Sequence, residues 1–334
     1  MHFRQWQRRE FVTLLGGAAA WPLAVRAQQS NRVRRIGVLM GLAEGDPEAQ
    51  LRVAAIRAEL QKLGWITGRN VEFDLRWAIA GVGRVREFAK ELVRLKPDVI
   101  LAQGTPSVAA LVQETRSIPI VFVQVSDPVE AGFVQDLTRP GGNVTGFTNF
   151  EIGVISEKWL EILKQIAPKV RRAAILLSPE KTNYSLWQPS IERAAALFAI
   201  EPIETPARTA REAYQALTAF AREANGSLVV LPDTFTVANR ATIITLAAEH
   251  RLPAVYPFKH FVQNGGLMSY GVDGADLYRR AVAYADSILK GGNPGELPVQ
   301  APEKYELIIN LKAAKALGLS VPTELLRRAD EVIG

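Results

Sequence analysis

The sequence contains no cysteine and only three histidines, His2, His250 and His260. The lack of thiols excludes disulfide bonds, thiolate zinc sites and cysteine nucleophiles. Three scattered histidines do not supply the ligand set of a multi-histidine metal site. We therefore expect no metal site.

Signatures of enzymes and of nucleotide-binding proteins are also missing. Gly37 and Gly41 near the first expected strand do not form GxGxxG, and neither GxxxxGK[ST] nor GxSxG occurs. His250 and His260 are best interpreted as solvated or capping side chains. No nucleophile stands beside a base. The sequence predicts neither an enzyme nor a cofactor.

Positive charge is scarce once the N-terminus is set aside. The formal net charge is +6, and Arg4, Arg8, Arg9 and Arg26 against Glu10 account for half of it. No later segment clusters Lys and Arg with aromatic residues, as nucleic-acid-binding surfaces do. We expect no nucleic-acid partner.

Residues 1–27, MHFRQWQRREFVTLLGGAAAWPLAVRA, have the features of an export signal. A basic start is followed by an apolar stretch, and residues 25–27 resemble a signal-peptidase site. Arg8-Arg9 followed by Phe11 resembles the twin-arginine signal. The alternative is an uncleaved anchor, which needs about 20 apolar residues, more than this interrupted run provides. We predict a cleaved twin-arginine signal peptide and a periplasmic protein.

The rest of the chain alternates strand-like and helix-like segments in two arrays. At 334 residues it is long enough for two domains, because single cores stop growing at roughly 250–300 residues. The first array is expected to have strands at 34–40, 71–77, 98–103 and 118–125, and helices at 47–63, 83–95 and 104–115. The second is expected to have helices at 152–166, 186–199, 211–224 and 236–249, and strands at 172–178, 201–205, 227–233 and 253–258. Such alternation predicts an α/β fold with parallel sheets.

The stretch 126–149, SDPVEAGFVQDLTRPGGNVTGFTN, separates the two arrays. A mixed tail follows the second array, with strands expected at 265–272 and 305–310, helices at 274–290, 311–317 and 322–329, and an extended crossing at 294–302. Because the tail belongs to neither array alone, we expect up to three crossings and a hinge. The predicted domains are an N-terminal lobe, 33–148 plus about 266–300, and a C-terminal lobe, 149–265 plus about 301–334.

Candidate ligand-binding residues lie where the expected strands end, because open parallel sheets bind ligands beyond their carboxyl ends. Asn149 lies just after the crossing, and tyrosines could add aromatic walls. The candidates are Gly41, Gln103, Thr105, Ser107, Ser126, Asp127, Asn149, Ser178, Tyr184, Asp233, Tyr256 and Tyr270.

Each polar candidate has a structural alternative. The helix N-terminus at Thr105 and Ser107 offers free N–H groups to a carboxylate, but either hydroxyl could instead cap the helix. Asp127 could hold an ammonium group or cap a helix begun by Pro128. Asp233 poses the same choice, and the tyrosines could belong to the core.

Three motifs resemble one known family. DPVEAGFVQDLTRPGGNVTGFTN, GGLMSYGVDGADLYRRAVAYADSILKGGNPGELPVQ and ELIINLKAAKALGLSVPTELLRRADEVI resemble the ABC-transporter substrate-binding proteins that include tryptophan- and tyrosine-type binders. The resemblance covers about residues 33–333. It implies a type I periplasmic-binding-protein fold, with two Rossmann-like lobes, a three-crossing hinge and a ligand in the cleft.

The resemblance also implies roles for matching positions. Thr105 and Ser107 match the seat of a ligand carboxylate. Asp127 and Asn149 match cleft positions on the first lobe and the crossing. The positions that match strand ends on the second lobe are Asp233 and Tyr256.

The leading hypothesis is an exported solute-binding component of an ABC importer. It would capture a small ligand, an amino acid or an aromatic or carboxylate compound, by hinge closure. We expect it to act as a monomer with a membrane permease and its ATPase as partners. The alternatives are a periplasmic sensor of the same fold that presents its ligand to a receptor, and an enzyme on two α/β lobes.

Overall fold

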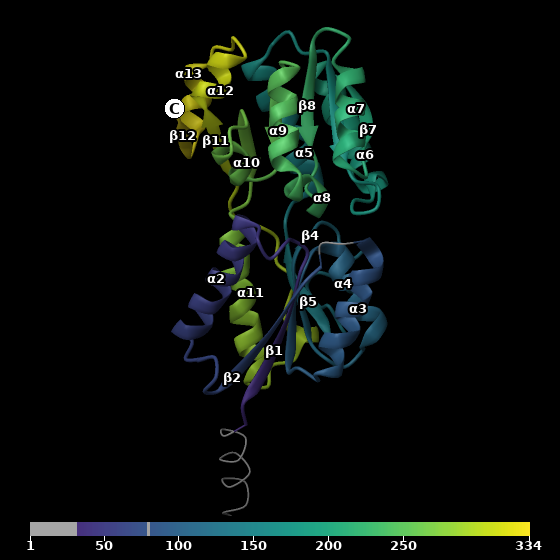
Figure 1. The fold of residues 1–334 in the computed structure, drawn as a ribbon, viewed down its shortest axis with the longest axis vertical. Helices are drawn as coiled ribbons and strands as arrows, with labels where there is room; N and C mark the ends of the chain where they lie inside the picture. The colour runs from purple at the N-terminus through teal and green to yellow at the C-terminus, as the bar shows by residue number, and fades with distance from the viewer. Residues whose placement is uncertain (1–31, 79–80) are drawn as a thin grey trace, which may run out of the picture.

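The computed structural model describes residues 32–78 and 81–334, so the predicted signal peptide at 1–27 lies outside the described residues. The described chain forms two α/β lobes that follow one another along the long axis of the molecule (Figure 1). None of the helices in this part of the chain is both long and apolar enough to cross a membrane.

Lobe 1 is built on a five-stranded sheet in the order β2-β1-β3-β4-β5, and all neighbouring strands in it are parallel. Its strands are β1 Arg34–Met40, β2 Val71–Trp77, β3 Val99–Gln103, β4 Ile120–Val125 and β5 Val144–Thr148. Its helices are α2 Pro47–Lys62, α3 Gly81–Arg94, α4 Gly104–Glu114 and α11 Gly274–Leu289. In Figure 1, α2 and α11 lie side by side on one face of the sheet, and α3 and α4 lie on the other.

Lobe 2 is built on a seven-stranded sheet in the order β12-β11-β10-β9-β8-β6-β7. Its strands are β6 Arg172–Leu177, β7 Glu201–Pro206, β8 Gly226–Val230, β9 Ala254–Tyr256, β10 Met268–Gly271, β11 Glu306–Asn310 and β12 Glu331–Ile333. Its helices are α5 Ile152–Ile166, α6 Tyr184–Phe198, α7 Ala210–Phe220, α8 Thr234–Ala238, α9 Arg240–Glu249, α10 Lys259–Gln263, α12 Leu311–Ala316 and α13 Thr323–Arg328. Only the β10–β11 pair is antiparallel among the described pairings of this sheet.

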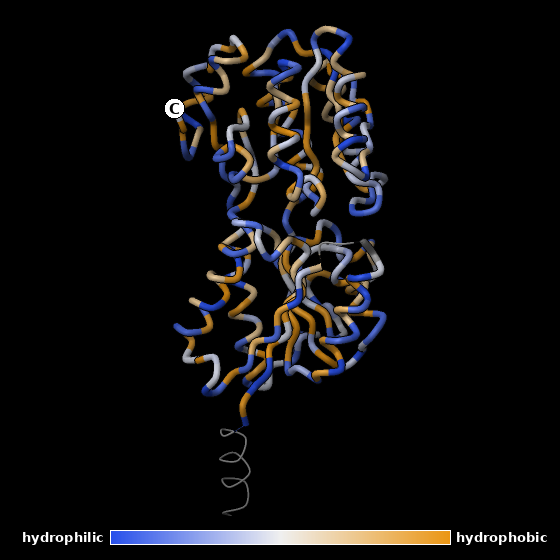
Figure 2. Tube along the Cα trace, viewed as in Figure 1, coloured by the Kyte–Doolittle hydropathy of each residue, from blue (hydrophilic) through white to orange (hydrophobic). Residues whose placement is uncertain are grey.

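The central strands are almost continuously apolar because helices cover both faces of each sheet. Every residue of β3, β4 and β5 is buried, and hydrophobic residues gather along the strands in Figure 2. Local signals start the helices, as in α2, where Asp46 accepts a hydrogen bond from the Glu48 N–H at 2.8 Å and Pro47 occupies the first turn.

The chain passes between the lobes three times, at 148–152, 271–274 and 300–306. The second passage needs glycine, because a Cβ at Gly271 would lie 1.8 Å from the Pro257 carbonyl oxygen. The third is tied to the first by backbone pairing of Phe147 with Gln300, preceded by a short 3-10 turn at Pro294–Glu296. Three adjacent connections restrict relative lobe movement to a hinge.

The structure differs from the sequence-based prediction in several elements. Strand β10 belongs to the lobe 2 sheet, whereas the predicted boundary near residue 266 assigned it to the N-terminal lobe; the chain returns to lobe 1 only after Gly271. The expected helix 236–249 is two helices separated at Asn239, because Asp233 caps a separate first turn. Pro128 begins a turn rather than a helix. Strand β12 was not predicted because it is only three residues long.

Candidate ligand-binding site

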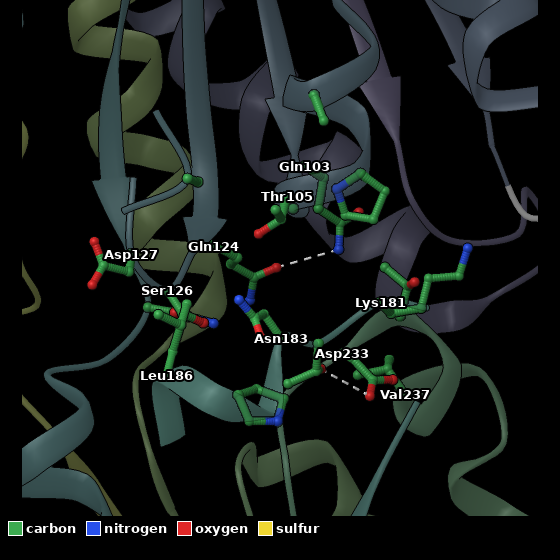
Figure 3. Close-up of a pocket in the computed structure, with 18 of the residues that line it drawn as sticks. Gln103, Thr105, Gln124, Ser126, Asp127, Lys181, Asn183, Leu186, Asp233 and Val237 are labelled. Atoms are coloured by element: carbon green, nitrogen blue, oxygen red, sulfur yellow. Dashed lines mark hydrogen bonds between the residues drawn. The ribbon is translucent and has the colours of Figure 1, made fainter. Parts of the chain in front are cut away.

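A chamber of about 360 Å³ lies between the lobes, at the ends of strands from both sheets. Figure 3 shows Gln103, Thr105 and Gln124 approaching from lobe 1, and Asn183 and Asp233 approaching from lobe 2. We call this space the inner chamber. It lies beyond the carboxyl ends of β3, β4, β6 and β8, where ligands bind to open parallel sheets.

The inner chamber combines apolar walls with a small number of polar groups. Its apolar lining consists of Pro106, Ala109, Ala131, Phe133, Leu186, Trp187, Pro232, Val237 and Phe258. Trp187 is held by stacking on Trp159, with ring centroids 5.7 Å apart, so this wall is rigid. A mostly apolar cavity with convergent polar groups is typical of a small-molecule site.

A second space of about 640 Å³, the outer chamber, lies against α4 and α6. Thr105, Lys181 and Asn183 line both chambers, so the two spaces adjoin at these residues. The outer chamber also contacts Tyr184, whose pKa is raised to about 12 by burial and by the nearby carboxylates Glu204 and Glu192.

The N-terminus of α4 faces the inner chamber without a side-chain cap. Gln103 occupies the N-cap position, but its side chain makes no capping hydrogen bond. Thr105 lines the chamber, whereas Ser107 is buried in the helix with 2% of its surface exposed. Uncapped backbone N–H groups and the positive end of the helix dipole make this terminus suitable for an anion.

Asp127 and Asn149 lie on the side of the chamber nearest the first crossing. Asp127 caps a turn by accepting a hydrogen bond from the Glu130 N–H at 3.0 Å, and it also lines the chamber. Asn149 is 3% exposed, and its Oδ1 has no hydrogen-bond partner among the described residues. Ser126 completes this side.

A chain of hydrogen bonds fixes two buried glutamines in the lobe 1 wall. The Gly41 N–H donates to Gln103 Oε1 at 3.1 Å, and Gln103 Nε2 donates to Gln124 Oε1 at 3.2 Å, as Figure 3 shows for the second bond. Arg52 Nη1 also donates to Gln124 Oε1, at 2.9 Å, and Arg52 Nε contacts Glu48 at 3.0 Å. Arg52 and Gln124 both line the inner chamber.

Asp233 in the lobe 2 wall is surrounded by donors. Its carboxylate accepts from the Ser178 N–H at 2.8 Å, from Thr182 Oγ1 at 3.2 Å and from the Thr236 N–H at 2.7 Å. Part of its surface touches the inner chamber, but the narrow chamber does not solvate it as bulk water does. Burial therefore raises the pKa of Asp233, against the opposing effect of these hydrogen bonds.

The lobes touch directly beside the chamber. Arg240 of α9 contacts Asp46 at 2.7 Å, and His260 Nδ1 lies 3.5 Å from a Glu48 oxygen. A Cβ at Gly41 would lie 2.8 Å from Thr234 Cγ2 of lobe 2. The lobes are thus closed against each other on the side of the α2 N-terminus.

The twelve predicted residues fall into two groups. Those that line the inner chamber are Gln103, Thr105, Ser126, Asp127, Asn149 and Asp233. Those that do not line it are Gly41, Ser107, Ser178, Tyr184, Tyr256 and Tyr270.

Packing explains three members of the second group, Tyr256, Tyr270 and Ser178. Tyr256 is 1% exposed and stacks on Phe261 with centroids 5.0 Å apart, and Tyr270 stacks on Tyr305 at 5.6 Å. Burial raises the pKa of both Tyr256 and Tyr270, as expected for phenols removed from water. Ser178 has a buried side chain and uses its N–H to hold Asp233.

The sequence-based candidates omit several residues of the chamber. Arg52 is a charged residue on the buried side of α2, between Ala49 and Val53, and Gln124 interrupts the apolar run at 118–125. A polar residue inside a buried pattern was the available signal for both. Nothing in the local sequence marks Lys181 or Leu186, since neither is embedded in an apolar pattern.

The model of one protein family, described as ABC transporter substrate binding protein, matches residues 36–333. The chain belongs to this family. Members of this ABC transporter substrate-binding family bind solutes and are not enzymes. Among the described residues, no group of three or more histidine, aspartate or glutamate side chains is placed to hold a metal ion.

Individual relatives agree with the family assignment. A protein named tyrosine-binding protein from Clostridioides difficile (strain R20291) is 29% identical over 290 residues, which are 87% of this chain and 82% of that protein. A conserved domain protein from Vibrio cholerae is 28% identical, with a TM-score of 0.83, covering 90% of this chain and all of that one.

Two further solved structures differ in whether a ligand is bound. The ABC domain from Streptococcus pneumoniae in complex with L-Trp is 24% identical, covers 90% and 99% of the two chains, and superposes with a TM-score of 0.82. A ligand-free, open substrate-binding protein with adhesive properties from Clostridium difficile is 26% identical with the same coverage, and its TM-score is 0.67. These likenesses identify the fold as the type I fold of periplasmic solute-binding proteins.

Proposed function

We propose that this substrate-binding protein is the exported solute-binding component of an ABC importer. It captures an amino acid or an aromatic or carboxylate compound between its lobes and delivers it to a membrane permease with an ATPase. The observation that carries the proposal is the inner chamber of about 360 Å³, with polar groups at the strand ends and apolar side chains from both lobes. This volume lies toward the small end of the roughly 300–1,000 Å³ typical of ligand pockets.

In the proposed binding mode, different residues contact the charged groups and the apolar side chain of an amino acid. The uncapped α4 N-terminus with Thr105 seats the carboxylate, and Asp127 faces the ammonium group. Asn149, with an unpartnered buried oxygen among the described residues, accepts a further hydrogen bond. Phe133 and Trp187 line the space for an aromatic side chain. The relatives named for tyrosine and solved with L-Trp support this class of ligand.

Hinge closure is supported by contacts and by likeness. The Arg240–Asp46 ion pair links the lobes in the present structure. The TM-score is higher to the L-Trp complex than to the ligand-free open protein, 0.82 against 0.67, as expected for a closed lobe arrangement. Opening breaks the ion pair and exposes the chamber.

Export is supported by the twin-arginine-like leader at 1–27, which directs the mature protein to the periplasm. We propose that the mature protein binds its ligand as a monomer. A single lobe pair encloses the inner chamber without a second copy of the chain.

The proposal is tested on the mature chain, purified without denaturation. Native mass spectrometry should show a monomer and a retained ligand of amino-acid size. Small-angle scattering should show a more compact particle when that ligand is added back, and thermal unfolding should shift upward. A flat thermal shift and unchanged scattering across a broad metabolite panel would falsify the proposed function.

A further inference from the structure

Phe150 lies in the first passage between the lobes, and its ring reaches the other two passages. It stacks on the ring of Tyr305 in the third passage, with centroids 6.3 Å apart. A Cβ on Gly271, where the second passage begins, would lie 3.5 Å from Phe150 Cε1. The Glu151 N–H donates to the Tyr305 hydroxyl at 3.0 Å and adds a polar tie between the first and third passages. All three passages therefore meet at one aromatic ring.

The same ring packs against two aromatic residues of lobe 2 that line the inner chamber. Its centroid lies 6.3 Å from that of Trp187 and 5.8 Å from that of Phe258. Trp159, which stacks on Trp187, meets Phe150 edge-on at 5.7 Å. Phe150 is 2% exposed, so all of these contacts are made inside the core. Aromatic pairs at such separations stabilise beyond the area they bury, so Phe150 joins the chamber wall firmly to the passages.

On the lobe 1 side, a different residue holds the passages. The carbonyl of Gln300 accepts from the Thr148 N–H at 3.0 Å, and the side chain of Gln300 is bonded to α11 at 2.8 Å. In the first passage, Asn149 alone separates Thr148, which is fixed to lobe 1, from Phe150, which is fixed to lobe 2. The corresponding interval in the third passage is 301–304.

We propose that Phe150 is a positioning residue for ligand binding, which makes the three passages and the aromatic wall of lobe 2 move as one body. This rests on the proposed hinge closure and deepens it. Bending is confined to short intervals on the lobe 1 side of the ring, such as Asn149. A ligand that contacts Trp187 in the chamber then acts on the hinge through a rigid set of packed rings.

The first experiment measures the hinge without a ligand. Because the chain has no cysteine, spin labels can be attached at Gln61→Cys in lobe 1 and Glu249→Cys in lobe 2. Both sites are exposed and lie at the ends of α2 and α9 that point away from the Asp46–Arg240 contact. Pulsed electron–electron double resonance on the mature chain gives the distribution of distances between the labels. We expect Phe150→Leu to broaden this distribution, because losing the ring loosens all three passages.

Phe220→Leu is the matched control. Phe220 also belongs to the apolar core of lobe 2 and is 7% exposed, but it packs under Arg172 at the start of β6, the end away from the chamber. Both variants should unfold at a lower temperature than the wild type, since each leaves a void in a packed core. Only Phe150→Leu should broaden the distance distribution, which a loss of stability alone does not change.

Tyr305→Leu provides a second variant at the same junction. It removes the ring that stacks on Phe150 in the third passage, and Tyr305 is only partly buried, so the core stays filled. The distribution should broaden, but less than in Phe150→Leu. If Phe150→Leu does not fold, the width in Tyr305→Leu decides the question.

The second experiment adds L-tryptophan and L-tyrosine and measures their affinities by calorimetry. Phe150→Leu should bind them about tenfold more weakly than the wild type, because the ligand must then order both the wall and the hinge. Phe220→Leu should keep the wild-type affinity.

The outcomes distinguish the inference from the function on which it rests. Wild-type widths in Phe150→Leu and Tyr305→Leu overturn the inference, and so does equal broadening in Phe150→Leu and Phe220→Leu. Wild-type affinity in Phe150→Leu also overturns it, while the proposed function stands. If the wild type binds neither amino acid, the amino-acid form of the proposed function fails, but the label distances still test the inference because they are measured without a ligand.

Discussion

The two walls of the inner chamber treat their buried polar groups in opposite ways. Gln124 Nε2 and Arg52 Nη2 in lobe 1, and Asn149 Oδ1 at the first crossing, have no partners among the described residues. In lobe 2, the carboxylate of Asp233 accepts three hydrogen bonds and begins α8. Both walls are polar, since lobe 2 also lines the chamber with Lys181 and Asn183, but the carboxylate of Asp233 is held mainly by groups of its own lobe.

This difference between the two walls indicates separate roles for them, one in recognising the ligand and one in enclosing it. Lobe 1 offers the chamber the uncapped N-terminus of α4, which suits an anionic group of a ligand. The carboxylate of Asp233 accepts three hydrogen bonds from its own lobe and fixes the loop and helix that carry Pro232 and Val237. We infer that lobe 1 reads the polar end of the ligand and that lobe 2 covers it.

The largest effect that this comparison predicts is on folding, at Asp233. Asp233→Ala leaves the Ser178 and Thr236 N–H groups without their acceptor and removes a helix cap, so it should lower the free energy of unfolding by about 2–4 kcal/mol. Urea denaturation measures this change. Asp136→Ala removes a carboxylate that caps an exposed turn and should have little effect. A small loss in Asp233→Ala would show that these hydrogen bonds contribute little to stability and would remove the contrast between the two walls.

A second prediction concerns pH and the contact between the walls. Burial lowers the pKa of His260 to about 2, reinforced by the cations Arg52, Arg240 and Lys259 and opposed by Glu48 at 3.5 Å. His260 is thus neutral when folded, whereas in the unfolded chain it binds a proton near its ordinary pKa of about 6.5. The unfolded state therefore binds more protons below that pH. Stability should fall as pH drops below about 6.5, by up to about 1.4 kcal/mol per pH unit from this group.

Denaturant unfolding between pH 7 and pH 4 checks the slope. His260→Asn should lose this acid-side component, whereas His250→Asn, at a partly exposed helix end bonded to Thr218, should keep the wild-type slope. Equal slopes in all three proteins would show that His260 is reached by water at the junction of the lobes.

The fold was predictable because its signals are local. Apolar runs marked β1 and β3, and the Asp46-Pro47 pair marked the start of α2, each within a few residues. The lobe membership of β10 was not predictable, since it depends on pairing with β9 and β11. Between β10 and β11 the chain passes through lobe 1, so this pairing is not local in the sequence.

The site was predictable only where position along a strand decides it. Thr105 and Asp127 follow strand ends, and the structure places both on the chamber. Tyr256 also ends a strand, but its ring turns into the core against Phe261. Gln124 depends on a bulge, and a bulge arises from the register between two strands rather than from one segment. Pattern and periodicity do not carry that information.

Asp127 tests whether lobe 1 also contributes a charge to recognition. Asp127→Ala should weaken ligand binding roughly tenfold while leaving the fold intact, because an ammonium group loses its counter-charge. Asp127→Asn keeps an acceptor for the Glu130 N–H and removes only the charge. Calorimetry on both variants should give similar losses. A loss in the alanine variant alone would assign Asp127 to the turn.

The smallest predicted effect is steric and lies where the two walls meet. Gly41 has an ordinary backbone conformation, but a Cβ there would lie 2.8 Å from Thr234 Cγ2, closer than a methyl group tolerates. Gly41→Ala should therefore hinder full closure and weaken ligand affinity by a factor of about 3–10, which corresponds to roughly 1 kcal/mol. Scattering of the liganded protein should show a larger particle than the wild type. Gly45→Ala, in the same loop with no atom near the added methyl, is the matched control and should bind normally. If Gly41→Ala closes and binds as well as Gly45→Ala, the Thr234 side chain must move to accommodate the added methyl group. The lobe 2 wall would then be more mobile than its hydrogen bonds indicate.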